Sequence, residues 1–222
     1  MDYQFDLVGK IGSMALIRKE DQEIDYNIIS RLGADLRPGM IWVTSGATEI
    51  GRLDYIKRTG CELSGDPDQD KADYAAQGQT ILMQNYRQFG SPEYGIRQIL
   101  VEHTHFNDPE KREHIRQLLI RAAEQKTIPI INYNDPVSDE ENRKMELAAR
   151  REKGEEVHEC VDNDETAAVI AGLVKAKTLV LMTSTEGIYQ DRRDPGTLVR
   201  DVIGKTYEDV ERTRVSGFPL SR

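Results

Sequence analysis

The stretch Ile128-Pro129-Ile130-Ile131-Asn132-Tyr133-Asn134-Asp135 joins a short apolar run to a cluster of amide and carboxylate side chains. This order is typical of a buried parallel strand that ends at the edge of a sheet. A second cluster, Val161-Asp162-Asn163-Asp164-Glu165, comes later in the chain, at the start of a predicted helix. Ligands of open α/β sheets bind in a crevice at the carboxyl ends of the strands. We therefore expect the two clusters to meet in one crevice.

Strand and helix patterns alternate along the rest of the chain. Alternation of this kind predicts an α/β fold with a mainly parallel sheet covered by helices on both faces. The segment 61–70 is polar and is predicted to be a loop. The predicted strands are 5–11, 40–43, 96–101, 128–131 and 178–182, and the predicted helices are 24–36, 47–57, 71–89, 109–125 and 163–176.

Length and composition limit the classes of protein to consider. The 222 residues, 38% hydrophobic and 31% charged, predict one domain, 1–222. A net charge of −9 argues against nucleic acid as the main partner, because such partners usually require a basic surface. Two cysteines are too few for a disulfide framework, so reduced thiols are expected. Without a signal peptide or a membrane-length apolar run, the sequence predicts a cytoplasmic protein with no membrane partner.

One segment, 139–160, differs from the rest because it is so densely charged. Between Asp139 and Glu156, 12 of 18 residues are charged. Glu140 with Lys144, and Glu146 with Arg150, have the i,i+4 order that supports a solvated helix. Two interpretations remain open: an exposed helical insertion, or a mobile flap over a substrate.

Two turns after predicted strands could bind an anion. Lys10-Ile11-Gly12-Ser13 brings a positive charge and glycine backbone N–H groups to the end of the first strand. Thr44-Ser45-Gly46-Ala47 joins a strand to the positive end of a helix. Each turn also has a purely structural explanation: a solvated lysine in the first, and small residues needed for packing in the second.

The two polar clusters could supply ligands for Mg²⁺, partners for a lysine, or amide groups for a polar substrate. Their structural alternative is helix capping, which Asp162 or Asn163 could provide for the helix that follows. The sequence has no G-x-x-x-x-G-K-[ST] motif, so a Walker-type ATPase is not supported. His103-Thr104-His105 lacks a third ligand at a convincing spacing, so no metal site is predicted and a loop pair is expected.

Six motifs together resemble those of the amino acid kinase family, and most closely its glutamate 5-kinase branch. They occur in the family's order from residue 8 to residue 195, with Asp194-Pro195 as the last match. The matching segments are Val8-Gly9-Lys10-Ile11-Gly12-Ser13, Val43-Thr44-Ser45-Gly46-Ala47, Ala75-Ala76-Gln77-Gly78-Gln79 with Leu82, Met83 and Tyr86, Ile128 to Asp135, Asp162-Asn163-Asp164 with Thr166-Ala167-Ala168, and Leu179 to Tyr189.

The resemblance implies a three-layer αβα sandwich that transfers the γ-phosphoryl group of Mg-ATP to a carboxylate of a small molecule. It implies that Lys10 stabilises charge on the transferring group and that Asp164 orients the lysine. ATP and Mg²⁺ are the implied cofactors, and a homo-oligomer is the implied assembly. The implied substrate-binding residues are Ser45, Gly46, Ala47, Asn132, Asn134, Asp135 and Asn163. The implied nucleotide-binding residues are Gly12, Ser13, Thr183, Ser184, Gly187 and Tyr189.

The chain departs from the family pattern at three places. No segment matches the family's G-G-M-x-T-K, so we expect the domain to lack that C-terminal segment and its lysine. Tyr133 stands where the family usually has Glu, and Ser184 where it usually has Asp. The alternatives are therefore a nucleoside-monophosphate (uridylate-type) or carbamate kinase on the same fold, or a catalytically impaired nucleotide-binding regulatory protein.

Overall fold

The computed structural model describes residues 5–18, 20–138, 140–154, 157–158, 160, 162–189, 191 and 193–201, the side chains of 140–143 excepted. The chain divides into two compact units, 1–182 and 183–222, and each is described by itself. The single domain expected from the length stays a prediction. Within the described ranges, no helix is long and apolar enough to cross a membrane.

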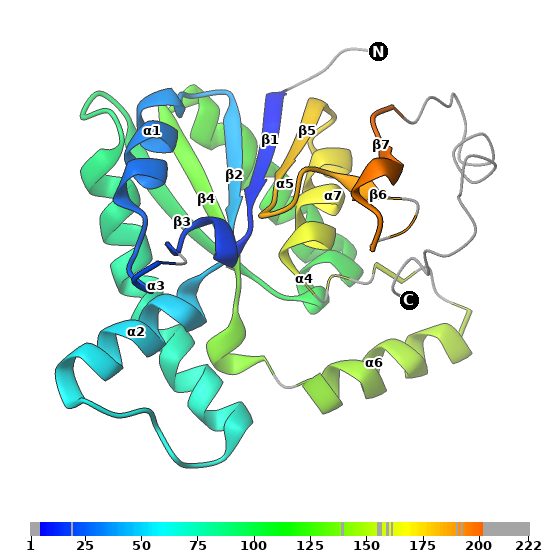
Figure 1. The fold of residues 1–222 in the computed structure, drawn as a ribbon. Helices are drawn as coiled ribbons and strands as arrows, with labels where there is room; N and C mark the ends of the chain where they lie inside the picture. The colour runs from blue at the N-terminus through cyan, green and yellow to red at the C-terminus, as the bar shows by residue number, and fades with distance from the viewer. Residues whose placement is uncertain are drawn as a thin grey trace. The chain divides into compact units, whose positions relative to one another are not determined.

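The first unit is built around a five-stranded sheet in the order β3-β4-β2-β1-β5, whose described strand pairs are all parallel (Figure 1). The helices between the strands run in the alternating order that the sequence predicts. The elements are β1 (Phe5–Ile11), η1 (Ser13–Ala15), α1 (Tyr26–Asp35), β2 (Met40–Thr44), α2 (Ala47–Thr59), α3 (Pro67–Phe89), β3 (Gly95–Val101), α4 (His103–Asn107), α5 (Pro109–Glu124), β4 (Thr127–Tyr133), η2 (Asp135–Val137), α6 (Glu140–Glu152), α7 (Asn163–Leu173) and β5 (Ala176–Met182).

Helices cover both faces of this sheet, which confirms the predicted three-layer α/β fold. Side chains alternate between the faces of a strand, so Trp42 packs on one side and its neighbours Ile41 and Val43 on the other. The core on the Trp42 side includes Ile29 of α1, Ile50 of α2 and Leu82 of α3. The core on the other side includes Leu119 of α5 and Ile170 of α7.

The neighbouring strands β2 and β4 are followed by helices that pack on opposite faces of the sheet. The helix that follows β2 packs on one face, whereas α7, which packs against the sheet after β4, lies on the other. In open α/β sheets, such a switch leaves a crevice beyond the carboxyl ends of the two strands. The topology therefore places a potential binding site at the ends of β2 and β4.

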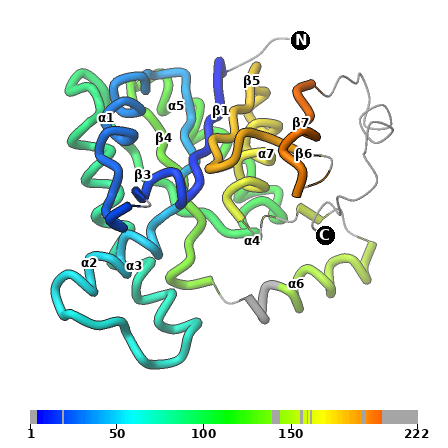
Figure 2. The backbone as a smooth tube through the Cα atoms, in the orientation of Figure 1, coloured from blue at the N-terminus to red at the C-terminus, as the bar shows by residue number. Residues whose placement is uncertain are grey.

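Glycines allow two unusually close approaches in this unit. A Cβ atom on Gly9 would lie 1.8 Å from the ring of Trp42, so the indole packs directly against the β1 backbone. A Cβ atom on Gly78 would lie 1.8 Å from the carbonyl oxygen of Ala47. The helices α2 and α3 therefore run in close contact, and Figure 2 shows them side by side.

Some element boundaries differ from the sequence prediction, and local chemistry explains why. The helix α3 begins at Pro67, inside the predicted loop, because the Asp66 side chain accepts hydrogen bonds from two first-turn N–H groups. The helix α7 ends at Leu173, and Lys175, with a φ of 50°, turns the chain into the next strand. The strand β5 therefore begins at Ala176, two residues earlier than predicted. The segment His103–Asn107 is the short helix α4 and not a loop.

The charged segment forms α6, as one of the two interpretations predicts. Its described side chains are largely exposed, but Leu147 is buried. Glu146 Oε2 lies 2.9 Å from His103 Nε2, and Arg150 Nη1 donates to the carbonyl oxygen of Asn107. These contacts attach α6 to α4, and its role as a flap stays a prediction.

The second unit contains a small antiparallel hairpin. Its elements are β6 (Ile188–Tyr189), η3 (Pro195–Thr197) and β7 (Leu198–Val199). Tyr189 pairs with Leu198, and Ile188 pairs with Val199. The Asp194 side chain caps η3 by accepting from Gly196 N.

Candidate functional site

Lys10 lies near the carboxyl end of β1, between β2 and β5. Its register partners are Val43 on β2 and Leu181 on β5, so neighbouring strands enclose it on both sides. The side chain is 9% exposed, and its Nζ lies 2.7 Å from Asp164 Oδ1. This contact is an ion pair. A buried ammonium requires such a partner, and the structure thus joins the two residues to which the resemblance gives catalytic roles.

The start of α7 holds Asp164 in place. The Asp162 side chain accepts from the backbone N–H groups of Asp164 and Glu165, each at 2.8 Å, and so caps the helix. Capping of this kind leaves Asp164 in the first turn, with its carboxylate directed to Lys10. The capping alternative for Asp162 is therefore confirmed.

The turns after β1 and β2 lie against each other. Ser45 N donates to the carbonyl oxygen of Ile11, and Gly12 N donates to that of Met182. Gly46 has a φ of +102°, and a Cβ atom there would lie 3.2 Å from Leu16 Cδ1 and 3.7 Å from Ser13 Cα. The positive φ favours glycine at this position, and a side chain there would also press on Leu16.

These turns have the properties of an anion cradle. The N-terminus of α2 has no side-chain cap, so its first N–H groups are not occupied by a capping side chain. The Lys10 ammonium lies 3.5 Å from where a Cβ atom of Gly12 would sit. Ala47 is buried and has no polar side-chain atom, so the donor that it could offer a ligand is its backbone N–H. A positive charge and a helix N-terminus beside one glycine turn suit a phosphate group.

An amide cluster lies at the crevice between β2 and β4. Asn163 Nδ2 donates to Ser45 Oγ at 3.1 Å and to Asn132 Oδ1 at 2.9 Å. The backbone N–H of Tyr133 donates to both Asn132 Oδ1 and Asn163 Oδ1. The two polar clusters predicted to converge are therefore linked directly by hydrogen bonds.

Two predicted substrate residues, Asn134 and Asp135, have surroundings that differ from those of the amide cluster. Asn134 Nδ2 donates to Glu102 Oε1 at 2.8 Å, so its amide is bonded to the residue that caps α4. Asp135 opens η2 and is half-buried. The substrate roles of Asn134 and Asp135 stay predictions.

The predicted nucleotide-binding residues after β5 lie in the second unit. Thr183 Oγ1 donates to the carbonyl oxygen of Thr185, and Tyr189 forms part of β6. A Cβ atom on Gly187 would lie 3.1 Å from Leu198 Cδ1, whereas Ser184 is exposed. Their roles stay predictions as well.

Sequence reasoning gave no role to one residue of the cluster, Gln79. Its Oε1 accepts from Asn132 Nδ2 at 2.8 Å, and the residue is only 6% exposed. The signal was present in the sequence, because Ala75, Leu82 and Tyr86 place position 79 on the apolar face of a helix. A glutamine on a buried stripe needs hydrogen-bond partners, which marks it for attention.

The described titratable side chains around the site include one thiol, Cys160, and two imidazoles, His103 and His105. Burial raises the pKa of the Cys160 thiol to about 12, so it remains protonated at neutral pH. His103 is bonded to Glu146, and His105 Nδ1 accepts from the backbone N–H of Glu102. Among the described residues, no group of three His, Cys, Asp or Glu side chains could hold a metal ion.

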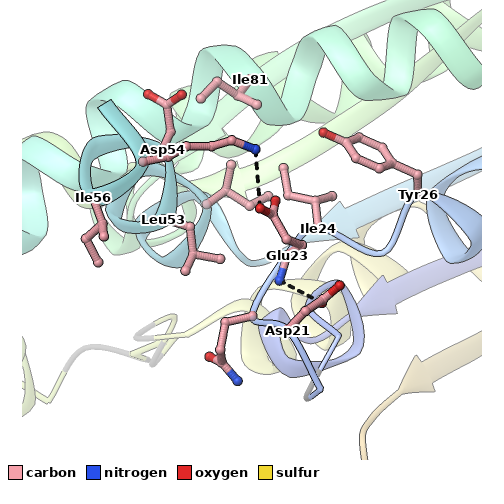
Figure 3. Close-up of a pocket in the computed structure, with 11 residues that line it drawn as sticks. Asp21, Glu23, Ile24, Tyr26, Leu53, Asp54, Ile56 and Ile81 are labelled. Carbon is pink, nitrogen blue, oxygen red and sulfur yellow. Dashed lines mark hydrogen bonds and ion pairs between the residues drawn. The ribbon is translucent and has the colours of Figure 1, made fainter. Parts of the chain in front are cut away.

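A separate pocket of about 380 Å³ lies between α2, α3 and residues 21–26 (Figure 3). Its wall is aliphatic, with Ile24, Leu53 and Ile81 among the lining residues, and carboxylates lie among them. Those carboxylates are already paired: Asp21 with Arg18, Glu23 with Lys57, and Asp54 with Arg58. No residue of the amide cluster lines it.

Comparison with known proteins supports the resemblance in the motifs. The model of the amino acid kinase family matches residues 7–217. A glutamate 5-kinase of Symbiobacterium thermophilum is 34% identical over 68% of this chain and 50% of its own length. The glutamate 5-kinase of Cupriavidus pinatubonensis is 30% identical over 97% of this chain and 55% of its own length. That of Burkholderia mallei is 32% identical over 88% of this chain and 50% of its own length. The chain thus spans about half the length of these relatives.

Proposed function

Because the chain belongs to the amino acid kinase family, we propose that it transfers the γ-phosphoryl group of Mg-ATP to a carboxylate of a small molecule, as a glutamate 5-kinase would. In this reaction a carboxylate oxygen attacks the γ-phosphorus, the bond to the bridging oxygen breaks, and ADP leaves. The products are an acyl phosphate and ADP. The relatives named glutamate 5-kinase support glutamate as the first acceptor to test.

The observation that carries the proposal is the Lys10–Asp164 ion pair beside the two glycine turns. Phosphoryl transfer depends on positioning and on stabilising charge, and it needs no protein nucleophile. Lys10 would offset the charge of the transferring group, while Asp164 would keep the ammonium in position. The N–H groups in the first turn of α2, which no side chain caps, would hold the phosphates.

The described residues fit a Mg²⁺ ion that arrives with the nucleotide. Mg²⁺ in such sites is usually bound by substrate phosphates and only one or two carboxylates, and no three-ligand group is found among the described residues. Asp164, exposed by about half, is the carboxylate nearest to the Lys10 ammonium in the described site. When bound, the ion would neutralise part of the phosphate charge.

The uncharged amide cluster favours a carboxylate acceptor over a phosphate-bearing one. Ser45, Asn132 and Asn163 can hold a small polar acceptor, but they carry no positive charge. A nucleoside monophosphate would call for cationic partners on that side. We therefore place the uridylate-type alternative second, together with carbamate.

The test is to incubate the purified chain with Mg-ATP and glutamate, aspartate, N-acetylglutamate, carbamate or UMP. Hydroxylamine would trap acyl phosphates, and UDP would be assayed separately. Lys10→Met is expected to lower turnover by about 10²–10³-fold or more, because it removes a cation from the transition state. Lys57→Met is the matched control, since its ion pair with Glu23 is exposed and lies outside the site.

Turnover of one acceptor that is lost in Lys10→Met but retained in Lys57→Met would support the kinase and name its substrate. ATP binding without turnover of any acceptor would contradict the proposal and favour the regulatory alternative. The expected homo-oligomer rests on the family resemblance alone, and sedimentation equilibrium would test it.

A further inference from the structure

Gln79 is held beside the amide cluster by the close contact of α2 and α3. Gly78, the preceding residue, has no room for a side chain, because a Cβ atom would lie 1.8 Å from the Ala47 carbonyl oxygen. This contact fixes α3 next to the helix that begins after Ser45. Gln79 is 94% buried, and its Oε1 accepts from Asn132 Nδ2 at 2.8 Å.

The direction of the hydrogen bonds in this cluster is set by one backbone group. The N–H of Tyr133 can only donate, so the atoms that face it, Asn132 Oδ1 at 2.9 Å and Asn163 Oδ1 at 3.0 Å, must be oxygens. Each amide therefore presents its NH₂ group on the other side. For Asn132 that NH₂ group meets Gln79 Oε1, and for Asn163 it meets Ser45 Oγ and Asn132 Oδ1.

This order determines what the Ser45 hydroxyl can do. Its oxygen already accepts from Asn163, and within the described part of the chain the hydroxyl hydrogen has no acceptor. A hydroxyl in this state is a hydrogen-bond donor to an incoming ligand. A carboxylate, which only accepts hydrogen bonds, is the matching partner.

We propose that Gln79 is a positioning residue for the acceptor substrate. By accepting from Asn132 Nδ2, it pairs the NH₂ group that faces away from Tyr133 and so stabilises the relay Gln79–Asn132–Asn163–Ser45, whose order leaves the Ser45 hydroxyl hydrogen for the acceptor carboxylate. This inference rests on the proposed function. Gln79 Nε2 is buried without a hydrogen-bond partner among the described residues, so Oε1 is the part of the Gln79 side chain that the relay uses.

The first test compares two variants of similar shape. Gln79→Met removes the acceptor and leaves the NH₂ group of Asn132, a residue that is 1% exposed, without its partner. It is expected to raise the KM for the carboxylate acceptor by about 5- to 30-fold, with the KM for ATP and kcat within about twofold of wild type. Gln79→Glu keeps an accepting oxygen and is expected to restore much of the acceptor KM. Asn85→Leu removes another buried amide of α3, which donates to the Ile81 carbonyl oxygen, and should leave the acceptor KM unchanged.

A double-mutant cycle tests whether the effect passes through Ser45. Gln79→Met should add little to the acceptor KM of Ser45→Ala, because both changes disable the same hydrogen-bond donor. Full additivity, or equal changes in the KM for ATP and for the acceptor, would overturn the inference and leave Gln79 a structural role only.

A second measurement does not need turnover. The side-chain NH₂ signals of Asn132 and Asn163 in ¹⁵N–¹H spectra should exchange slowly in the wild-type chain, and that of Asn132 should lose protection in Gln79→Met. If no acceptor is turned over but this protection behaves as expected, the proposed function fails while the relay stands. If the kinase is active but Gln79→Met leaves both protection and acceptor KM unchanged, the relay fails while the kinase stands.

Discussion

The strands β4 and β5 have the same length and run parallel in the same sheet, yet they differ completely in burial. All seven residues of β4 are buried, whereas six of the seven in β5 are exposed and the seventh, Ala176, is half-buried. β4 pairs on both sides, with β3 and β2, but in the described sheet β5 pairs only with β1. Position in the sheet, and not composition, therefore decides which apolar run becomes core.

The two strands also differ in what their carboxyl ends hold. At the end of β4, Asn132 bonds to Gln79 and to the Tyr133 backbone through hydrogen bonds that are buried. At the end of β5, Met182 offers only its carbonyl oxygen, to Gly12 N, while its side chain is exposed. A rigid, desolvated strand is the better support for side chains that must keep one orientation.

The largest expected effect is a difference in the loss of stability when a side chain is truncated in each of the two strands. Ile131→Ala removes a fully buried side chain of β4 and should lower the free energy of unfolding by about 2–5 kcal/mol. Leu181→Ala truncates a side chain that is 46% exposed on β5 and should cost less than about 1 kcal/mol. Urea denaturation of both variants would measure this, and similar losses would show that β5 is as buried in solution as β4.

A smaller difference in the free energy of unfolding is expected when a glycine is replaced by alanine in the helices beside the two strands. Gly78→Ala in α3 would push a methyl group into the Ala47 backbone and should cost about 1–3 kcal/mol. Gly172→Ala in α7, the helix against β5, meets nothing within 4 Å and should be neutral or stabilise by up to about 1 kcal/mol. Thermal unfolding of both would check this, and a stabilising Gly78→Ala would contradict the close helix contact.

The mildest test leaves stability almost unchanged and uses thiol chemistry. In a Cys61→Ser background, the thiol introduced by Leu181→Cys should react with maleimide at pH 8, and faster as pH rises past its ordinary pKa of about 8.5. Cys160 has a pKa raised to about 12, because it is buried and lies near Glu165 and Asp162. It should stay protonated and unlabelled from pH 7 to 9. Mass spectrometry would measure the maleimide labelling of each thiol. If Cys160 were labelled as fast as the thiol introduced by Leu181→Cys, its burial would be contradicted.

Much of this architecture follows from local patterns in the sequence. Apolar runs ending in polar turns predicted each strand of the sheet, and the clusters at Asn132 and Asn163 do meet. The exposure of β5 could not be predicted, because Leu-Val-Leu-Met is apolar whether its strand is central or at an edge. Periodicity reports which face of an element is apolar, not how many neighbours the element has.

The parts of the site that sequence reasoning missed depend on contacts between distant residues. Asn134 turns to Glu102, 32 positions away, and Gln79 meets Asn132 across 53 positions. No local pattern specifies such pairs. The start of α3, by contrast, was available from Asp66 and Pro67, which together form a helix-start signal.

The contact between Gly9 and Trp42 gives this protein a built-in optical probe. Trp42 is the only tryptophan in the sequence, it is 4% exposed, and it lies against the backbone of β1 one residue before Lys10. Its fluorescence should therefore be blue-shifted in the folded chain and shift to longer wavelength only when β1 and β2 separate. Emission from one indole would then follow the integrity of the strand pair that carries Lys10 and Ser45, without any added label.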